Sequence, residues 1–134
     1  MIEETVAYAL LKAMKSTRGA IDPVLAERGV HTGQDLLLSA LWRADGVTQT
    51  ELAARLGIEA PTVSKALQRL ERTGYVRRES GPGRARRVYL TDEGRALRAP
   101  VERAWRNADR RVARRLGADD MAELRRILSR LTRE

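Results

Sequence analysis

Apolar side chains recur every three or four residues along most of this chain, which is the spacing of one face of an α-helix. The first stripe consists of Ile2, Val6, Ala9, Leu10 and Ala13. The last consists of Met121, Leu124, Leu128 and Leu131. Between them, residues 36–42 are apolar nearly all round and predict a central, buried helix. The pattern therefore predicts a mainly helical protein with an amphipathic helix at each end.

Local signals predict where helices begin in the N-terminal part of the chain. Asp22 followed by Pro23 matches a helix cap and a first-turn proline, so we expect a kink or a restart there. This helical segment should end at Gly29. Residues 32–35 resemble a capping box and predict the start of the apolar helix.

Two short helices are predicted in the middle of the chain. Residues 48–51, Thr-Gln-Thr-Glu, form a capping box in which the threonine hydroxyl and the glutamate carboxylate each satisfy an unpaired amide. Gly57 supplies the left-handed residue that ends the first of these helices. The next helix, from about residue 60 to 73, buries one side. That side consists of Val63, Leu67 and Leu70.

A hairpin is predicted after the second of these helices. From Tyr75 to Leu90, apolar residues alternate with charged ones on both sides of Gly81-Pro82-Gly83. This pattern predicts two strands joined by a tight turn. Helix, turn, helix and basic hairpin, in this order, predict a winged helix-turn-helix, which places one helix in a DNA groove and the hairpin beside it.

The C-terminal part predicts a long helix followed by a shorter one. Thr91 is placed to cap a helical segment that extends to about Leu116. Pro100 lies inside this segment, so we expect a kink near residues 96–100, because proline removes a backbone hydrogen bond. Gly117 should separate this segment from the last helix.

The distribution of charge points to a polyanionic partner. The 134-residue chain has a net charge of +8. Eight Lys or Arg and two Glu lie between Lys65 and Arg87, so the second short helix and the hairpin carry +6. A second block, from Arg95 to Arg115, also carries +6. We interpret it as the solvated face of the long helix, with pairs such as Glu102–Arg106.

Composition argues against catalytic and membrane functions. Cysteine is absent and His31 is the only histidine, so neither a Cys or His metal site nor a Ser-His-Asp triad is expected. The motifs of a Gly-rich phosphate or dinucleotide loop are missing. No apolar run approaches the roughly 20 residues that cross a bilayer, and the acidic N-terminus lacks the basic start of a signal peptide. We therefore expect a cytoplasmic protein, associated with the nucleoid when bound to DNA, that is not an enzyme and has no metal or cofactor.

The outer face of the second short helix provides candidate major-groove contacts. They are Pro61, Thr62, Ser64, Lys65, Gln68 and Arg69. Gln and Arg side chains can pair with adenine and guanine through two hydrogen bonds, whereas Ser, Thr and Lys suit phosphates and base edges. The alternative is an ordinary solvated helix face, which the surrounding motif disfavours.

The hairpin provides candidate minor-groove contacts. They are Arg84, Arg86 and Arg87. The alternative is a charged edge that prevents strand aggregation, but three arginines at one tip exceed that need. Candidate phosphate contacts are Thr48 and Gln49 at a helix N-terminus, Arg72, and Arg77 at the base of the hairpin.

The apolar stripes at the two ends of the chain lie outside the winged module, and each needs a surface to pack against. They can pack on each other, or on a second copy across a two-fold axis. A DNA-binding dimer would use the second arrangement, because paired half-sites lie roughly 34–36 Å apart on one duplex face.

Several segments resemble the MarR family, which is named after a multiple-antibiotic-resistance regulator of bacteria. They are Pro-Thr-Val-Ser-Lys at 61–65, Leu-Glu-Arg-Thr-Gly-Tyr-Val at 70–76 and Val-Tyr-Leu-Thr-Asp-Glu-Gly at 88–94. The resemblance implies a mainly α fold with a small β-hairpin wing (α+β), in a single domain over 1–134. Within it, a winged helix-turn-helix core at 32–95 would lie between helical dimerisation regions at 1–30 and 96–134.

The resemblance also implies a function. It implies a homodimeric, sequence-specific regulator of transcription, usually a repressor, that binds a palindromic operator in double-stranded DNA and is released by a small molecule. The implied ligand pocket involves Tyr8, His31, Trp42 and Trp105, with core or interface packing as the alternative for the two tryptophans. The alternative function is a winged-helix adaptor that binds protein or RNA through its basic face.

One position departs from the family pattern. Family wings usually carry Asp-x-Arg a few residues before the Leu-Thr pair, and the aspartate steadies an arginine that enters the minor groove. Arg84 matches that arginine, but Pro82 stands in place of the aspartate. We expect Pro82 to stiffen the tip, and Arg86 and Arg87 to share the phosphate contacts.

Overall fold

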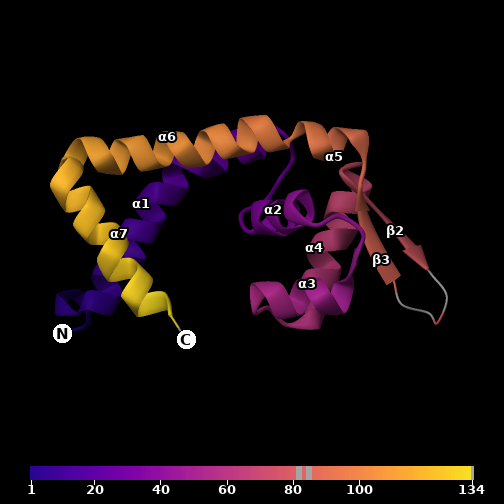
Figure 1. Ribbon diagram of the computed structural model, residues 1–134, viewed down its shortest axis with the longest axis horizontal. Helices are drawn as coiled ribbons and strands as arrows, with labels where there is room; N and C mark the ends of the chain where they lie inside the picture. The colour runs from indigo at the N-terminus through magenta and orange to yellow at the C-terminus, as the bar shows by residue number, and fades with distance from the viewer. Residues whose placement is uncertain (81–82, 84–85, 134) are drawn as a thin grey trace. The chain divides into compact units, whose positions relative to one another are not determined.

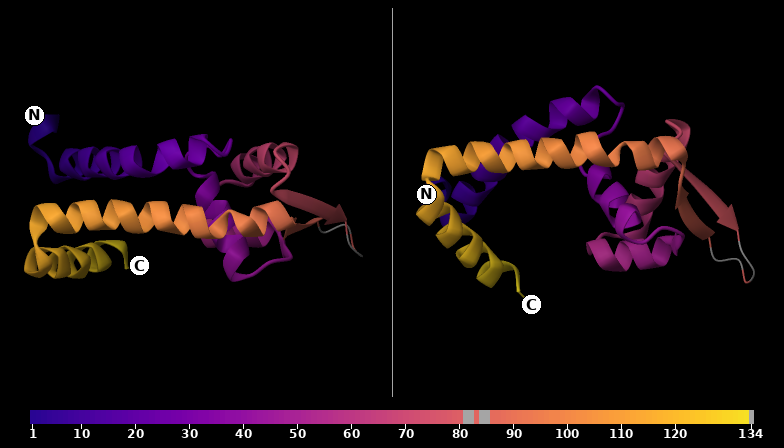
Figure 2. Two further views of the ribbon diagram at one scale, coloured as in Figure 1. Left: turned by 90° about the horizontal axis from the view of Figure 1, so that it is seen from above. Right: turned by 45° about the horizontal axis from the view of Figure 1, so that its top comes forward.

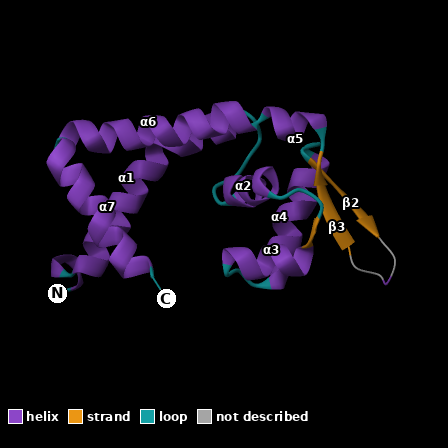
Figure 3. Ribbon diagram, in the orientation of Figure 1, coloured by secondary structure: helices purple, strands orange, loops and turns teal. Residues whose placement is uncertain are grey.

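The computed structural model describes every residue except 81–82, 84–85 and 134. Its elements are the 3-10 helix η1 (Ile2–Glu4), the helices α1 (Val6–Ala26), α2 (Gln34–Arg43), α3 (Gln49–Leu56), α4 (Ala60–Arg72), α5 (Asp92–Ala96), α6 (Arg98–Leu116) and α7 (Ala118–Thr132), and the strands β1 (Val47–Thr48), β2 (Val76–Ser80) and β3 (Arg86–Leu90) (Figure 1). The protein is mainly helical with one small antiparallel sheet (Figure 3), so the predicted fold class is confirmed.

The chain divides into two compact units. The central unit contains residues 22–102 and includes α2 to α5 and the sheet. The terminal unit contains residues 1–21 and 103–134, and therefore most of α1, most of α6 and all of α7.

The central unit is a winged helix-turn-helix built round an apolar core. Its sheet has the strand order β1-β3-β2 with antiparallel pairing throughout. The most deeply buried side chains come from every layer: Leu38 and Leu41 of α2, Leu52 of α3, Val63, Leu67 and Leu70 of α4, and Val76 and Val88 of the hairpin. Because α3 and α4 bury one side in this core, their opposite faces lie on the surface of the unit, as does the polar face of the β2–β3 hairpin.

The terminal unit leaves much apolar surface exposed. Helix α7 turns back from the end of α6 at Gly117, whose φ is +83° (Figure 2). Arg125 Nη2 donates a hydrogen bond to Asp109 Oδ2 at 2.7 Å, which links α7 to α6. The exposed apolar side chains of α1 and α7 are Val6, Leu10, Leu11, Met14, Ile127, Leu128 and Leu131. Each of these helices is therefore amphipathic, and its apolar face lies open to solvent in the single chain.

Of the two alternatives expected at Asp22-Pro23, a kink or a restart, the restart is wrong. Helix α1 runs without interruption from Val6 to Ala26 and contains Pro23. An interior proline costs about 3 kcal/mol, but Leu25 is completely buried. Burial of a leucine side chain contributes about 1.5–3 kcal/mol, so tertiary packing offsets much of the local cost.

The predicted capping box at residues 32–35 is also wrong. Helix α2 begins at Gln34, and its N-cap is Gly33 with a φ of +94° and no side-chain cap. The side chains of Gln34 and Asp35 instead accept hydrogen bonds from the backbone amides of His31 at 3.0 Å and Gly33 at 3.1 Å. Both side chains are buried, so they satisfy amides of the loop rather than the first turn of the helix.

The sheet and the long C-terminal helix give one missed element and one confirmed expectation. Strand β1 was not predicted, because a two-residue strand that pairs only with β3 has no alternation to reveal it. The expected kink near residues 96–100 is confirmed as a break at Leu97, between α5 and α6. Pro100 consequently lies in the first turn of α6, where its missing amide costs little.

Candidate nucleic-acid interface

Helix α4 presents a polar and basic face opposite its buried side. Val63, Leu67 and Leu70 are at most 1% exposed. Of the six predicted groove contacts, Pro61, Thr62, Lys65, Gln68 and Arg69 are exposed, and Ser64 is half-buried. The helix begins after Glu59 with Pro61 in its first turn, where proline is tolerated. The exposed lysine, glutamine and arginine side chains of this face can form hydrogen bonds with base edges.

Helix α3 is held at its start by the predicted capping box. Thr48 Oγ1 accepts a hydrogen bond from the Glu51 amide at 3.1 Å, and Glu51 Oε2 accepts one from the Thr48 amide at 3.1 Å. At its other end, Gly57 has a φ of +62°, which allows the tight turn into α4. The cap fixes the start of α3, and Gly57 ends it before α4. We call α3, α4 and the β2–β3 hairpin together the reading head.

The β2–β3 hairpin has one apolar face and one polar face. In the antiparallel register, Val76 lies opposite Leu90 and Val88 opposite Arg78. Residues opposite each other share a face, so Val76, Val88 and Leu90, which are all buried, define the inner face. Arg77 and Tyr89 share the outer face.

Each described arginine of the hairpin has a distinct environment. Arg77 forms an ion pair with Glu79, and its guanidinium carbon lies 4.6 Å from the centre of the Tyr89 ring. Arg87 Nη1 donates to the Gly46 carbonyl at 2.8 Å. Arg86 is exposed. The predicted wing residue Arg84, and Pro82 beside it, lie outside the described residues.

The other predicted phosphate contacts lie around the same reading head. Thr48 uses its hydroxyl in the helix cap, and Gln49 Oε1 accepts a hydrogen bond from Arg78 Nη1 at 3.2 Å. Arg72 is exposed in the last turn of α4. Sequence reasoning missed the role of Arg78, whose side chain is only 9% exposed. The signal was available in the alternation of β2, because Arg78 follows Val76 on the inner face.

The four predicted pocket residues lie in two different units. In the central unit, His31 lines a hollow of about 300 Å³ together with Thr62, Lys65 and Arg69 of α4. Trp42 Nε1 donates a hydrogen bond to the Gly94 carbonyl at 3.0 Å.

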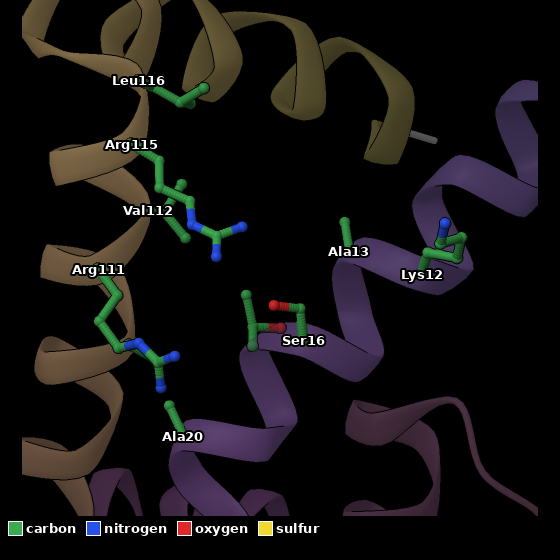
Figure 4. Close-up of a pocket in the computed structure, with 10 residues that line it drawn as sticks. Lys12, Ala13, Ser16, Ala20, Arg111, Val112, Arg115 and Leu116 are labelled. Carbon is green, nitrogen blue, oxygen red and sulfur yellow. The ribbon is translucent and has the colours of Figure 1, made fainter.

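Tyr8 and Trp105 belong to the terminal unit, where Lys12 lies 5.9 Å from the Tyr8 ring and Arg18 lies 5.5 Å from the Trp105 ring. This unit has its own hollow of about 350 Å³ between α1 and α6 (Figure 4). Its basic lining residues are Lys12, Arg111 and Arg115.

Within the described part of the chain, no group of three His, Asp or Glu side chains is arranged to hold a metal ion. Over the same residues, every helix is too short or too polar to cross a membrane.

Comparisons with known proteins agree on one family. A family model described as MarR family matches residues 28–87. The HTH-type transcriptional repressor Rv2887 of Mycobacterium tuberculosis is 30% identical over 128 residues, which cover 94% of this chain and 92% of that protein. The HTH-type transcriptional regulator TtmR of Methylorubrum extorquens is 30% identical over 103 residues, or 75% of this chain. The match covers 53% of TtmR, so this chain spans about half of that relative.

Solved structures show the same fold. The transcriptional repressor CouR, bound to a 23-mer DNA duplex, superimposes with a TM-score of 0.86 at 29% identity, covering 98% of this chain and 95% of that chain. Rv2887 in complex with DNA gives a TM-score of 0.76 at 28% identity, over 96% of this chain and 98% of that one. Rv2887 in complex with p-aminosalicylic acid gives 0.74 at 29% identity, over 96% and 99%.

Proposed function

Since this chain belongs to the MarR family, we propose that it is a homodimeric transcription regulator that binds a palindromic operator in double-stranded DNA. The observation that carries this proposal is the exposed polar and basic face of α4 within a helix-turn-helix. A helix has the diameter to enter the major groove, and the second helix of such a motif is the one that enters it.

We propose Lys65, Gln68 and Arg69 as the principal base and phosphate contacts of α4. All three side chains are exposed on the side of the helix away from Val63, Leu67 and Leu70. Gln68 suits adenine and Arg69 suits guanine through paired hydrogen bonds, and Lys65 suits a phosphate or a guanine edge. Pro61, Thr62 and Ser64 complete the contact surface near the start of the helix.

The wing would bind beside the helix. Arg86 is exposed at the first residue of β3. Arg84, which lies outside the described residues, is predicted from the sequence to contact the minor groove as well. Arginines inserted into a minor groove or placed along phosphates add affinity that depends on salt. Arg87 holds the Gly46 carbonyl through one nitrogen, so its remaining N–H groups are the ones offered to a phosphate.

The homodimer is supported by the terminal unit. Helices α1 and α7 expose apolar faces, and the Leu131 side chain alone is 62% exposed. Exposed apolar stripes of this kind mark association surfaces. A two-fold axis through this unit would present two α4 helices to successive half-sites of a palindrome.

We further propose that the protein is a repressor and that a small organic anion releases it from DNA. Rv2887, a repressor at 30% identity, has a structure with p-aminosalicylic acid. Each of the two hollows combines basic side chains with apolar walls, which suits an aromatic carboxylate. Of the four predicted pocket residues, His31 lines the hollow of the central unit, whereas Tyr8, Trp42 and Trp105 are not among the residues that line either hollow.

Selection of bound duplexes from random DNA tests the proposal. The expected result is an inverted repeat whose half-sites are about one helical turn apart. A mobility shift of that duplex should persist in a large excess of unrelated DNA. If the protein binds all duplexes equally and only at low salt, the proposal of a sequence-specific regulator is wrong and the adaptor alternative is favoured.

A further inference from the structure

Arg78 differs from the other arginines of the hairpin in the direction of its side chain. It lies opposite Val88 in the β2–β3 register, on the buried inner face. Its side chain is 9% exposed, whereas that of its neighbour Arg77 is 51% exposed. An arginine turned inward in this way has little surface left for a phosphate.

The guanidinium of Arg78 connects three elements of the reading head. Nη1 donates to Gln49 Oε1 at 3.2 Å, at the first residue of α3. Nη2 donates to Glu71 Oε1 at 3.1 Å, in the last turn of α4. Arg78 itself belongs to β2. One side chain therefore links the wing, the recognition helix and the helix before it.

The Arg78–Glu71 pair is charge-assisted. The hydrogen bond from Arg78 holds the pKa of the Glu71 carboxyl below its ordinary value, against the smaller opposing effect of burial. Glu71 therefore stays ionised at neutral pH, and the pair adds no net positive charge to the DNA-facing surface. Arg78 also keeps its Nε atom buried, without a hydrogen-bond partner in the described part of the chain.

We infer that Arg78 is a positioning residue that sets the angle of α4 and the wing against α3, and that Glu71, although acidic, promotes specific DNA binding through it. This inference rests on the proposed function. Base readout needs side chains placed to within a fraction of an ångström, whereas binding to phosphates tolerates looser placement. A loosened pair should therefore reduce sequence discrimination more than overall affinity.

Four substitutions separate this role from phosphate binding. Arg78→Met and Glu71→Gln break the pair. Glu79→Gln is the matched charge control on the outer face of the same strand. Arg77→Met, at a predicted phosphate contact on that face, provides the reference for a lost phosphate contact and should reduce the salt slope. For each variant, the dissociation constants of the selected operator and of an unrelated duplex are measured over a range of salt concentrations. Thermal unfolding establishes that each variant is folded.

The variants should differ in their effects on sequence preference and on operator affinity. Arg78→Met should lower the preference for operator over unrelated DNA about tenfold, a size typical of coupled groups, and leave the salt dependence unchanged. Glu71→Gln should weaken operator binding although it removes a negative charge. Glu79→Gln, in contrast, should strengthen binding slightly through charge alone.

Two outcomes overturn the inference. One is an Arg78→Met variant that keeps its preference but has a salt slope smaller by about 0.9, because that change marks a lost phosphate contact. The other is a Glu71→Gln variant that binds the operator as tightly as the wild type. If Arg78→Met does not fold, Arg78→Lys replaces it, because lysine keeps the charge and loses the planar fork.

A measurement without DNA separates failure of this inference from failure of the proposed function. If the wild type prefers no duplex, the proposed function fails. A double-mutant cycle of Arg78→Met and Glu71→Gln in urea unfolding then still tests the pair. Non-additive effects support the link between β2 and α4, and additive effects overturn it.

Discussion

Arg77 and Arg78 are neighbours in β2, yet their guanidinium groups lie in different surroundings. Arg77 stacks on Tyr89 on the outer face of the hairpin. Arg78 reaches inward to Gln49 and Glu71. Successive residues of a strand point to opposite faces. Two neighbouring arginines of equal charge can therefore differ in role, one being exposed to solvent and the other linking parts of the fold. Substitutions of single residues should therefore separate into effects on specificity, on salt dependence and on stability.

Substitution of Arg69 should change the sequence preference of DNA binding, whereas substitution of Arg86 should change its salt dependence. Arg69→Ala removes a candidate base contact from α4, so it should cost about 1–3 kcal/mol on the operator and relax the sequence preference at one position. Arg86→Ala removes a candidate phosphate contact, so it should weaken binding to all duplexes and reduce the salt slope by about 1. Titrations of operator and unrelated duplexes at several salt concentrations measure both effects. Wild-type behaviour of both variants would contradict the assignment of this face to DNA.

The Glu71 carboxyl should make stability depend on pH on the acid side. The hydrogen bond from Arg78 lowers the pKa of this carboxyl in the folded protein, so its contribution is present above the unfolded pKa and is lost as pH falls through the lowered, folded pKa. The contribution should be below about 1 kcal/mol, because the Glu71 side chain is 41% exposed and solvent screens the pair.

Urea unfolding of the wild type and of Glu71→Gln measures this contribution. The difference in unfolding free energy between them should be largest near neutral pH and should shrink below the ordinary pKa of a glutamate. A difference in unfolding free energy that stays constant from neutral pH to below that pKa would show that protonation of Glu71 does not affect stability.

At the scale of elements, local chemistry predicted the parts of the central unit that depend on neighbouring residues. The cap of Thr48 and the break before Pro100 arise from contacts within a few residues, and the stripe of α4 is recognisable from the spacing of its apolar residues alone. The continuation of α1 through Pro23 depends instead on burial of Leu25, and β1 exists only because β3 lies beside it. Long-range partners of this kind leave no mark on a local pattern, and the Arg78–Gln49 bond is missed for the same reason.

Gly94 should be essential for packing α5 against the hairpin. A Cβ atom at this position would lie 2.1 Å from the Tyr75 carbonyl oxygen, which accepts the Thr91 amide. Backbone cannot move aside cheaply, so Gly94→Ala should destabilise the protein by about 1–3 kcal/mol.

Gly19→Ala is the matched control for Gly94→Ala. Gly19 lies exposed inside α1, and a Cβ atom there would meet no atom within 4 Å. Alanine is the better helix former, so this variant should be more stable by up to about 1 kcal/mol. Urea unfolding of both variants checks the prediction, and equal effects would contradict the close approach at Gly94.

At the scale of the whole molecule, the two units divide their chemistry. The central unit contains most of the buried apolar side chains and the reading head. The terminal unit instead exposes the apolar faces of α1 and α7. A single chain thus has most of its core in one unit and, in the other, the exposed apolar faces that we propose as its association surface. In the proposed dimer, DNA binding by paired half-sites would depend on both units, because association through the terminal unit would bring two α4 helices onto one duplex.

Leu131→Glu should therefore abolish operator binding without touching the DNA-binding face. Leu131 is 62% exposed on α7, and in a two-fold dimer the substitution would place a carboxylate at the interface twice. Loss of a buried leucine and burial of a charge should weaken the dimer by about 3 kcal/mol or more. Ala122→Glu is the control, because Ala122 is exposed about half a turn round the same helix from the apolar stripe. Sedimentation should show monomers for Leu131→Glu and dimers for Ala122→Glu, and only the second should shift the operator. A Leu131→Glu variant that stays dimeric and binds like the wild type would move the association surface away from α7.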